Sequence, residues 1–192
     1  SNTTQTVWKS IEFLGDLKTG SGNDTVLIPG DNRVGVKQGN GGLQVPSRNS
    51  RNIDLGDGSD YIKTGLMEGT IVGGSKSGET DTIVLDYSTV DTTLVGQKNW
   101  FLQSYISDFA RTDGSAYQTG EFYLYTPTDS GLPYSGGSTV IRSKDFERLI
   151  VTGTSNGDYI LGLKDGDTVF GGSGDDYISS GGGVDVVDGG NG

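Results

Sequence analysis

Near the end of the 192-residue chain, an aspartate recurs every nine residues. Two residues after each aspartate comes a β-branched aliphatic residue. The aspartates are Asp158, Asp167, Asp176 and Asp185, and the aliphatic residues are Ile160, Val169, Ile178 and Val187. A fixed period of this kind indicates a repeat architecture. Regularly spaced carboxylates are hard oxygen ligands, and the chemistry that they favour is the binding of a hard cation such as Ca²⁺.

The repeat unit predicts a geometry. Its four copies are GTSNGDYIL (153–161), GLKDGDTVF (162–170), GGSGDDYIS (171–179) and SGGGVDVVD (180–188). A six-residue turn followed by a three-residue strand makes half a coil, so equivalent residues of successive coils stack at about 4.8 Å, the spacing of neighbouring strands. We expect Asp158 to stack with Asp176 on one edge of the coil, and Asp167 with Asp185 on the other. Two carboxylates that close repel each other unless a cation lies between them.

The glycines of the turns suit the same purpose. Glycine permits positive φ, which leaves backbone carbonyls free to point into the gap between coils. A flexible ring of about six to eight oxygens suits Ca²⁺ better than Mg²⁺, which requires a tight octahedron. Further expected ligands stand at the second or fourth turn positions: Asn156, Asp165, Gly172, Gly174, Gly181 and Gly183. The aliphatic column is expected to point inward and to form a thin core.

These four units resemble the haemolysin-type calcium-binding repeats of the RTX (repeats-in-toxin) family, whose consensus is GGxGxDxUx with U a large apolar residue. Residues 171–179 match at every defined position. Other residues replace consensus glycines at Thr154, Asn156, Leu163, Asp165 and Ser180. The resemblance implies an all-β fold, a right-handed parallel β-roll or β-helix, with several Ca²⁺ ions between its turns and export by a type I system. The final GGNG (189–192) reads as the start of another repeat, so we expect the array to continue beyond it.

The composition favours an ion-dependent fold and excludes several kinds of chemistry. The chain has 34 glycines, 31% hydrophobic residues and a net charge of −11, a balance typical of disorder unless the acids are neutralised. Its 20 aspartates against 5 glutamates favour turns over helices. The absence of cysteine and histidine excludes disulfides, thiolate or imidazole zinc sites and histidine-based triads. Such acidity disfavours nucleic acid and anionic lipid as partners, and no apolar run is long enough to cross a membrane.

Traces of the repeat occur in the first half of the chain. TGSGNDTVL (19–27), LGDGSDYIK (55–63) and GGSKSGETDTIVL (73–85) place an aspartate in the acidic column, the last after three extra residues. These aspartates are Asp24, Asp60 and Asp81. The in-phase residues between the first two are Arg33, Gly42 and Arg51, so ligands are missing there. We interpret residues 1–85 as an irregular β-helical region with occasional calcium sites; the alternative is that the three aspartates are ordinary turn residues.

Residues 86–150 interrupt the repeat and separate that region from the repeats of 151–192. They hold 11 of the 17 aromatic residues, and the alternation in GEFYLYT (120–126) predicts a strand, as does FERLIVTG (146–153). One interpretation is a β-rich insertion whose aromatic residues pack together and cap the stack. The other is a platform for a sugar or peptide ligand, formed by Trp100, Tyr105 and Tyr123.

Two functions follow from these features. The first is a non-enzymatic calcium-binding module, monomeric, of a larger secreted bacterial adhesin, toxin or surface protein, which folds on binding Ca²⁺ outside the cell. The second is part of a secreted β-helical polysaccharide lyase or epimerase, or its carbohydrate-binding module. Its base and charge stabiliser would come from Tyr105, Arg111, Arg142 or Lys144. The net charge disfavours a polyanionic substrate and histidine, the commonest base, is absent, so we favour the first and expect no catalytic residues.

Overall fold

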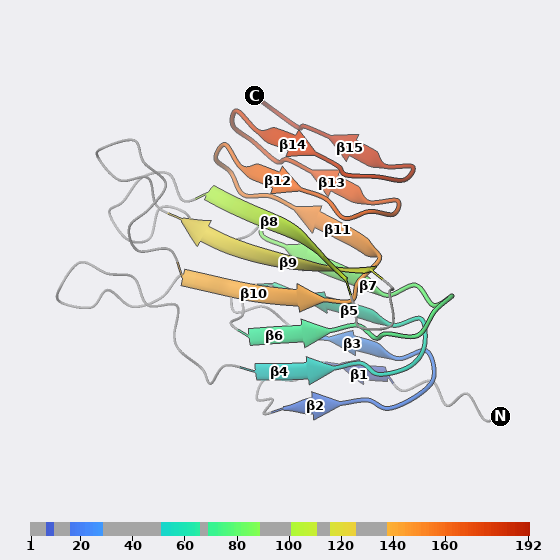
Figure 1. Ribbon diagram of the computed structural model, residues 1–192. Helices are drawn as coiled ribbons and strands as arrows, with labels where there is room; N and C mark the ends of the chain where they lie inside the picture. Colours follow the sequence, from blue (N-terminus) through green and yellow to red (C-terminus); the bar gives the residue numbers. More distant parts are fainter. Residues whose placement is uncertain are drawn as a thin grey trace.

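A computed structural model of the protein describes residues 7–9, 16–28, 51–65, 69–88, 101–110, 116–125 and 138–192. All regular elements in these residues are strands, and the described part of the chain holds no helix that could span a membrane. The strands form two sheets, which lie one behind the other in Figure 1 and which we call sheet A and sheet B. The described part of the protein is therefore all-β, and the prediction of few helices from the excess of aspartate over glutamate is confirmed there.

Sheet A has seven strands and sheet B has eight. In order, sheet A consists of β1 (Val7–Lys9), β3 (Thr25–Leu27), β5 (Tyr61–Thr64), β7 (Thr82–Asp86), β11 (Arg148–Thr152), β13 (Thr168–Phe170) and β15 (Val186–Asp188). Sheet B consists of β14 (Tyr177–Ser179), β12 (Tyr159–Leu161), β8 (Phe101–Ala110), β9 (Ala116–Tyr125), β10 (Ser138–Lys144), β6 (Gly69–Val72), β4 (Arg51–Asp54) and β2 (Leu17–Lys18). Outside β8–β10, consecutive strands from β2 to β15 alternate between the sheets.

The strand register follows the predicted period in the C-terminal repeats. Tyr159 pairs with Tyr177, and Thr168 pairs with Val186, each 18 residues further along the chain in parallel strands. Because of this register the rings of Tyr159 and Tyr177 stack with centroids 4.5 Å apart and planes within 5°. The four predicted three-residue strands are β12 to β15.

The first half of the chain follows the same plan with other spacings. Thr25 pairs directly with Tyr61, so no strand lies between β3 and β5, and the acidic turns before them are neighbours. Arg51 begins β4, while Arg33 and Gly42 fall outside the described residues. Tyr61 pairs with Thr82, 21 residues on, which accommodates the three extra residues of the turn between them.

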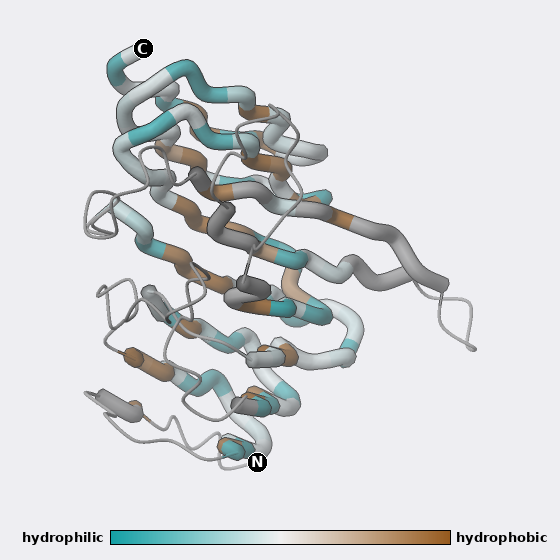
Figure 2. The backbone as a smooth tube through the Cα atoms, turned by 90° about the vertical axis from the view of Figure 1, so that its left-hand side faces the viewer, coloured by the Kyte–Doolittle hydropathy of each residue, from teal (hydrophilic) through white to brown (hydrophobic). Residues whose placement is uncertain are grey.

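The core lies between the two sheets and becomes thinner toward the C-terminus. Figure 2 shows hydrophobic stretches that recur in successive strands. Column residues with no exposed surface are Val26, Ile62, Ile71, Ile83, Ile160 and Val169. By contrast, Ile178 is only partly buried, and the side chain of Val187 is 49% exposed.

Strands β8, β9 and β10 form the insertion within residues 86–150. β9 runs antiparallel to both neighbours, whereas β8 is parallel to β12 and β10 is parallel to β6. The insertion therefore lies inside sheet B and not at an end of the stack (Figure 1). Its inward side chains Leu102, Phe122 and Ile141 are fully buried in the common core. Trp100 and the side chains of Tyr105 and Tyr123 lie outside the described part of the structure.

Candidate metal centre

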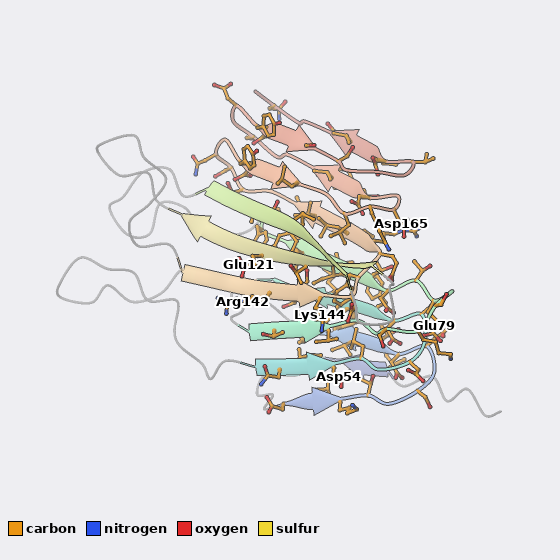
Figure 3. All side chains as sticks on the ribbon, viewed as in Figure 1. Asp54, Glu79, Glu121, Arg142, Lys144 and Asp165 are labelled. Carbon is orange, nitrogen blue, oxygen red and sulfur yellow. The ribbon has the colours of Figure 1, made fainter. Side chains whose placement is uncertain are left out.

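The turns between the two sheets that the structure describes throughout end in an acidic residue, directly before the next strand. We call the turns that lead from sheet B to sheet A the B-to-A turns; they comprise residues 19–24, 55–60, 73–81, 145–147, 162–167 and 180–185. The A-to-B turns are 153–158 and 171–176. Glu79 and Asp165 mark two B-to-A turns on one edge of the molecule in Figure 3. Every carboxylate is thus positioned by the strand that follows it.

The B-to-A carboxylates form a column along that edge. Its members are Asp24, Asp60, Asp81, Glu147, Asp167 and Asp185. Each carboxylate after the first accepts a backbone N–H from the preceding coil. The bonds are Asp24 N–H to Asp60 Oδ1 (2.7 Å), Asp60 N–H to Asp81 Oδ1 (2.8 Å), Asp81 N–H to Glu147 Oε2 (2.9 Å), Leu149 N–H to Asp167 Oδ1 (2.7 Å) and Asp167 N–H to Asp185 Oδ1 (2.9 Å).

The A-to-B turns repeat this arrangement. The backbone N–H of Asp158 donates to Asp176 Oδ1 at 2.8 Å, and that of Leu102 in β8 donates to Asp158 Oδ1 at 2.6 Å. The predicted neighbours, Asp158 with Asp176 and Asp167 with Asp185, are therefore adjacent on opposite edges. Backbone dipoles offset part of the repulsion along each edge, but they carry no full positive charge.

The turns are of two kinds, which differ in what contacts the second carboxylate oxygen. In turns 153–158 and 162–167 the second residue, Thr154 or Leu163, donates its N–H to Oδ2 of the turn's own aspartate. Thr154 Oγ1 also donates to Asp158 Oδ1 at 2.9 Å. We call these closed turns, because protein donors already contact both carboxylate oxygens.

The other kind, the open turn, has glycine in the left-handed region at its second and fourth positions. In turn 171–176, Gly172 has φ of 108° and Gly174 has φ of 105°, and turns 19–24, 55–60 and 180–185 share this conformation. Oδ2 of Asp176 and Oδ2 of Asp60 are buried without a hydrogen-bond partner in the described structure. A buried carboxylate oxygen without a donor is costly, so the open turns are the candidate positions for a cation.

Two oxygen atoms from neighbouring coils converge beside Gly171. A Cβ atom placed on Gly171 would collide with Asp176 Oδ2 and would lie 2.6 Å from the carbonyl oxygen of Gly189 in the next coil. The same convergence of a carboxylate oxygen and a next-coil carbonyl occurs at Gly153, Gly162 and Gly73. Only glycine leaves this oxygen-lined space open. Two oxygens of this kind, with further carbonyls, form a donor set typical of Ca²⁺.

Burial raises the pKa values of several aspartates at the ends of these turns. Desolvation is the first cause in every case: it raises the pKa of Asp60, Asp158 and Asp167 to about 6 and that of Asp81 to about 7, against backbone hydrogen bonds that lower them. Neighbouring carboxylates raise these pKa values further; Asp24 acts on Asp60 and Asp185 on Asp167. The folded protein therefore holds these groups in surroundings that disfavour their charge.

The remaining expected ligands occupy different settings. Gly181 and Gly183 have φ of 85° and 94° in open turn 180–185. Asn156 is half-buried and Asp165 is exposed, both in closed turns. No cluster of three or more acidic side chains suited to a metal ion occurs within the described ranges. A site here must therefore combine one or two carboxylates with backbone carbonyls.

The short turn 145–147 departs from the repeat. It contains no glycine, yet Asp145 has φ of 59°, the one non-glycine residue with positive φ in the described structure. Arg148, directly after the turn, donates from Nε to the carbonyl of Gly166 in the next coil at 3.1 Å. A fixed guanidinium charge thus lies between turns 145–147 and 162–167. Sequence reasoning missed Glu147 as a column member because its turn does not have the length of the repeat.

The residues considered for a lyase or epimerase do not form a shared site in the described structure. Arg142 is exposed and pairs with Glu121 of the neighbouring strand, with Nε and Oε1 3.0 Å apart (Figure 3). Lys144 is half-buried and lies two residues further along, at the C-terminal end of β10. Arg111 and the side chain of Tyr105 lie outside the described residues.

Comparisons with known proteins yield no family match, no similar curated protein and no similar solved structure. The resemblance to RTX repeats therefore rests on the residues themselves.

A glycine substitution tests the space beside Asp176. Gly171→Ala should lower the melting temperature, because the added methyl group meets Asp176 Oδ2 and the Gly189 carbonyl; overpacking of this kind costs about 1–3 kcal/mol. Gly189→Ala is the matched control, because its Cβ would meet no atom within 4 Å. Equal melting temperatures for the two variants would contradict the described geometry.

The pH dependence of the stability of the calcium-free protein tests whether folding raises the pKa values of the buried carboxylates. Their pKa values are raised on folding, so between about pH 4 and pH 7 the folded state binds more protons than the unfolded state, and stability falls as pH rises. We expect a higher melting temperature at about pH 5 than at about pH 7.5 without calcium. Differential scanning calorimetry in a chelator measures this difference. A melting temperature that rises from about pH 5 to about pH 7.5 would show that folding does not raise the pKa values of these carboxylates.

Proposed function

We propose that this chain is a calcium-binding repeat module of a larger secreted bacterial protein, folded as a parallel β-roll with Ca²⁺ ions between its stacked turns. The alternation of strands between two mostly parallel sheets and the 18-residue register of the C-terminal coils support the β-roll. The agreement of residues 171–179 with the RTX consensus supports the ion and, through the family's usual export route, an extracellular location.

The buried oxygen of Asp176 carries the proposal. Oδ1 accepts the N–H of Asp158, whereas Oδ2 has no donor and lies beside the carbonyl of Gly189 in a space that a side chain would fill. A cation at this point supplies the missing partner for the carboxylate and neutralises charge that backbone donors leave uncompensated. Ca²⁺ is favoured over Mg²⁺ because carbonyls of a flexible turn tolerate irregular coordination.

The acidic turns indicate where an ion would matter most. In turn 153–158 protein donors contact both carboxylate oxygens of Asp158, whereas in turn 171–176 Oδ2 of Asp176 has no donor in the described structure. An ion that binds only the folded state would add stability at the turn that the protein leaves incomplete. Affinities of about 10⁻⁴ to 10⁻³ M, common in extracellular modules, suit such a role.

Substitution of Asp176 tests this function. Asp176→Asn keeps the shape of the side chain but removes its charge, so we expect the calcium concentration at half-transition to rise by roughly tenfold or more, equivalent to about 1.4 kcal/mol of binding free energy. The transition is followed by circular dichroism after removal of calcium with a chelator.

Asp175→Asn is the matched control. Asp175 is the exposed neighbour in the same turn, and its substitution changes the net charge by the same amount. We expect a small shift from this variant, due only to long-range attraction, which salt screens. If the two variants shift the calcium midpoint equally, Asp176 is not a ligand and the proposal fails at its central residue.

A further inference from the structure

The C-terminal coils of sheet B rest on a strand that does not belong to the repeat. On one side β12 pairs with β14, a strand of the same repeat array. On the other side it pairs with β8, a strand of the insertion. In sheet A the equivalent coils continue from β11, which follows the parallel stack without interruption. The first repeat strand of sheet B therefore begins on a foreign edge.

This foreign edge reproduces contacts that one repeat coil makes with the next. The N–H of Leu102 donates to Asp158 Oδ1 at 2.6 Å, as the N–H of Asp158 does to Asp176 Oδ1 at 2.8 Å. Gln103 takes the register position opposite Tyr159 that Tyr177 takes on the other side. The N–H group of Leu102 therefore makes the hydrogen bond to Asp158 that the backbone of a preceding repeat would make.

The backbones of β8 and β12 pair only at Gln103 and Tyr159, and a side chain of β8 supplies further hydrogen bonds to β12. Ser104, fully buried in β8, accepts the N–H of Leu161 on its Oγ at 2.7 Å and donates to the carbonyl of the same residue at 3.2 Å. Both polar groups of Leu161 are satisfied by one hydroxyl. We call Leu102 N–H, the Gln103 register position and Ser104 Oγ the β8 edge.

The β8 edge does not need an ion to hold its position. β8 pairs with β9 over ten residue pairs, from Phe101 with Tyr125 to Ala110 with Ala116, and β9 pairs in turn with β10. Leu102 and Phe122 are buried in the common core. Since Asp158 accepts donors from Leu102 and Thr154, its turn closes on protein contacts alone, whereas Asp176 one coil further keeps an unbonded oxygen.

We propose that the β8 edge is the site on which the calcium-dependent coils of residues 153–192 start to order, with ordering that proceeds from β12 to β14 and Ser104 as its positioning residue. This inference rests on the calcium-binding function proposed above. It assigns the insertion a role in folding control: a preformed edge that lowers the calcium needed to order the first repeat. Later coils then add to an edge of their own kind.

Hydrogen–deuterium exchange at increasing calcium concentration tests this inference on the full chain. In the wild-type protein we expect β12 to gain protection at a lower calcium concentration than β14. Ser104→Ala leaves the buried N–H and carbonyl of Leu161 without partners, so the calcium midpoint for both strands should rise by roughly threefold or more. Ser104→Thr keeps a hydroxyl in a residue that strands favour, so it should restore most of the wild-type midpoint.

Ser143→Ala is the matched control. Ser143 is also a buried serine of the insertion, but its hydroxyl donates to the carbonyl of Gly120 at 3.3 Å, within the insertion itself. We expect this variant to leave the calcium midpoints of β12 and β14 unchanged while β9 and β10 stay protected in both alanine variants. Equal midpoints in Ser104→Ala and Ser143→Ala, or protection of β14 before β12, would overturn the inference.

The same experiment distinguishes a failure of the calcium-binding function from a failure of the proposed starting edge at β8. If protection of residues 153–192 in the wild-type protein ignores calcium, the calcium-binding function is wrong. In that case faster exchange of β12 in Ser104→Ala than in Ser143→Ala, measured without calcium, would still support a starting edge at β8. Equal exchange would overturn it.

Discussion

The structure depends on how carboxylates can be stacked at strand spacing. Two unit charges about 4.8 Å apart repel by roughly 3 kcal/mol at an effective dielectric constant of about 20, and the B-to-A edge repeats this contact along the stack. Backbone N–H groups from the preceding coil reduce the cost at each step, from Asp24 to Asp185. They do not neutralise the charge, and burial raises the pKa of Asp60, Asp81, Asp158 and Asp167. In the function proposed above, a divalent cation held by carbonyls of the same turns would offset this repulsion.

Closed and open turns differ in whether protein donors contact both oxygens of the carboxylate. In the closed turn of Asp158, the protein supplies donors to both carboxylate oxygens. In the open turn of Asp176, left-handed glycines turn the second N–H elsewhere and leave Oδ2 beside a carbonyl. In the C-terminal repeats each interface between neighbouring coils joins a closed turn to an open one. One ion at such an interface would therefore complete a turn that the protein leaves incomplete.

The nine-residue period predicted much of this arrangement. Because the repeats are local and regular, the positions of β12 to β15, the adjacency of Asp158 with Asp176, and the inward direction of Ile160 and Val169 follow from spacing alone. Where the period is broken, prediction fails. Glu147 ends a three-residue turn that resembles no repeat, and Arg148 places a fixed charge beside it.

Contacts between residues far apart in the sequence could not be predicted from it either. The partner of Leu161 is Ser104, 57 residues earlier, and nothing in the local sequence of either residue indicates the other. The sequence also left open whether residues 86–150 cap the stack or form a platform for a ligand. Their strands lie within sheet B because β8 can imitate a repeat edge on one side while β10 extends the parallel stack of β6 on the other.

Isothermal titration calorimetry of the wild-type protein with CaCl₂, after removal of all divalent ions and with MgCl₂ as the comparison, tests the central claim most directly. We expect more than one Ca²⁺ to bind per chain, at dissociation constants of about 10⁻⁴ to 10⁻³ M, with much weaker binding of Mg²⁺. An absence of saturable Ca²⁺ binding in this range would show that the stacked carboxylates are stabilised by the protein alone. Equal affinity for the two ions would contradict a site built on flexible carbonyls.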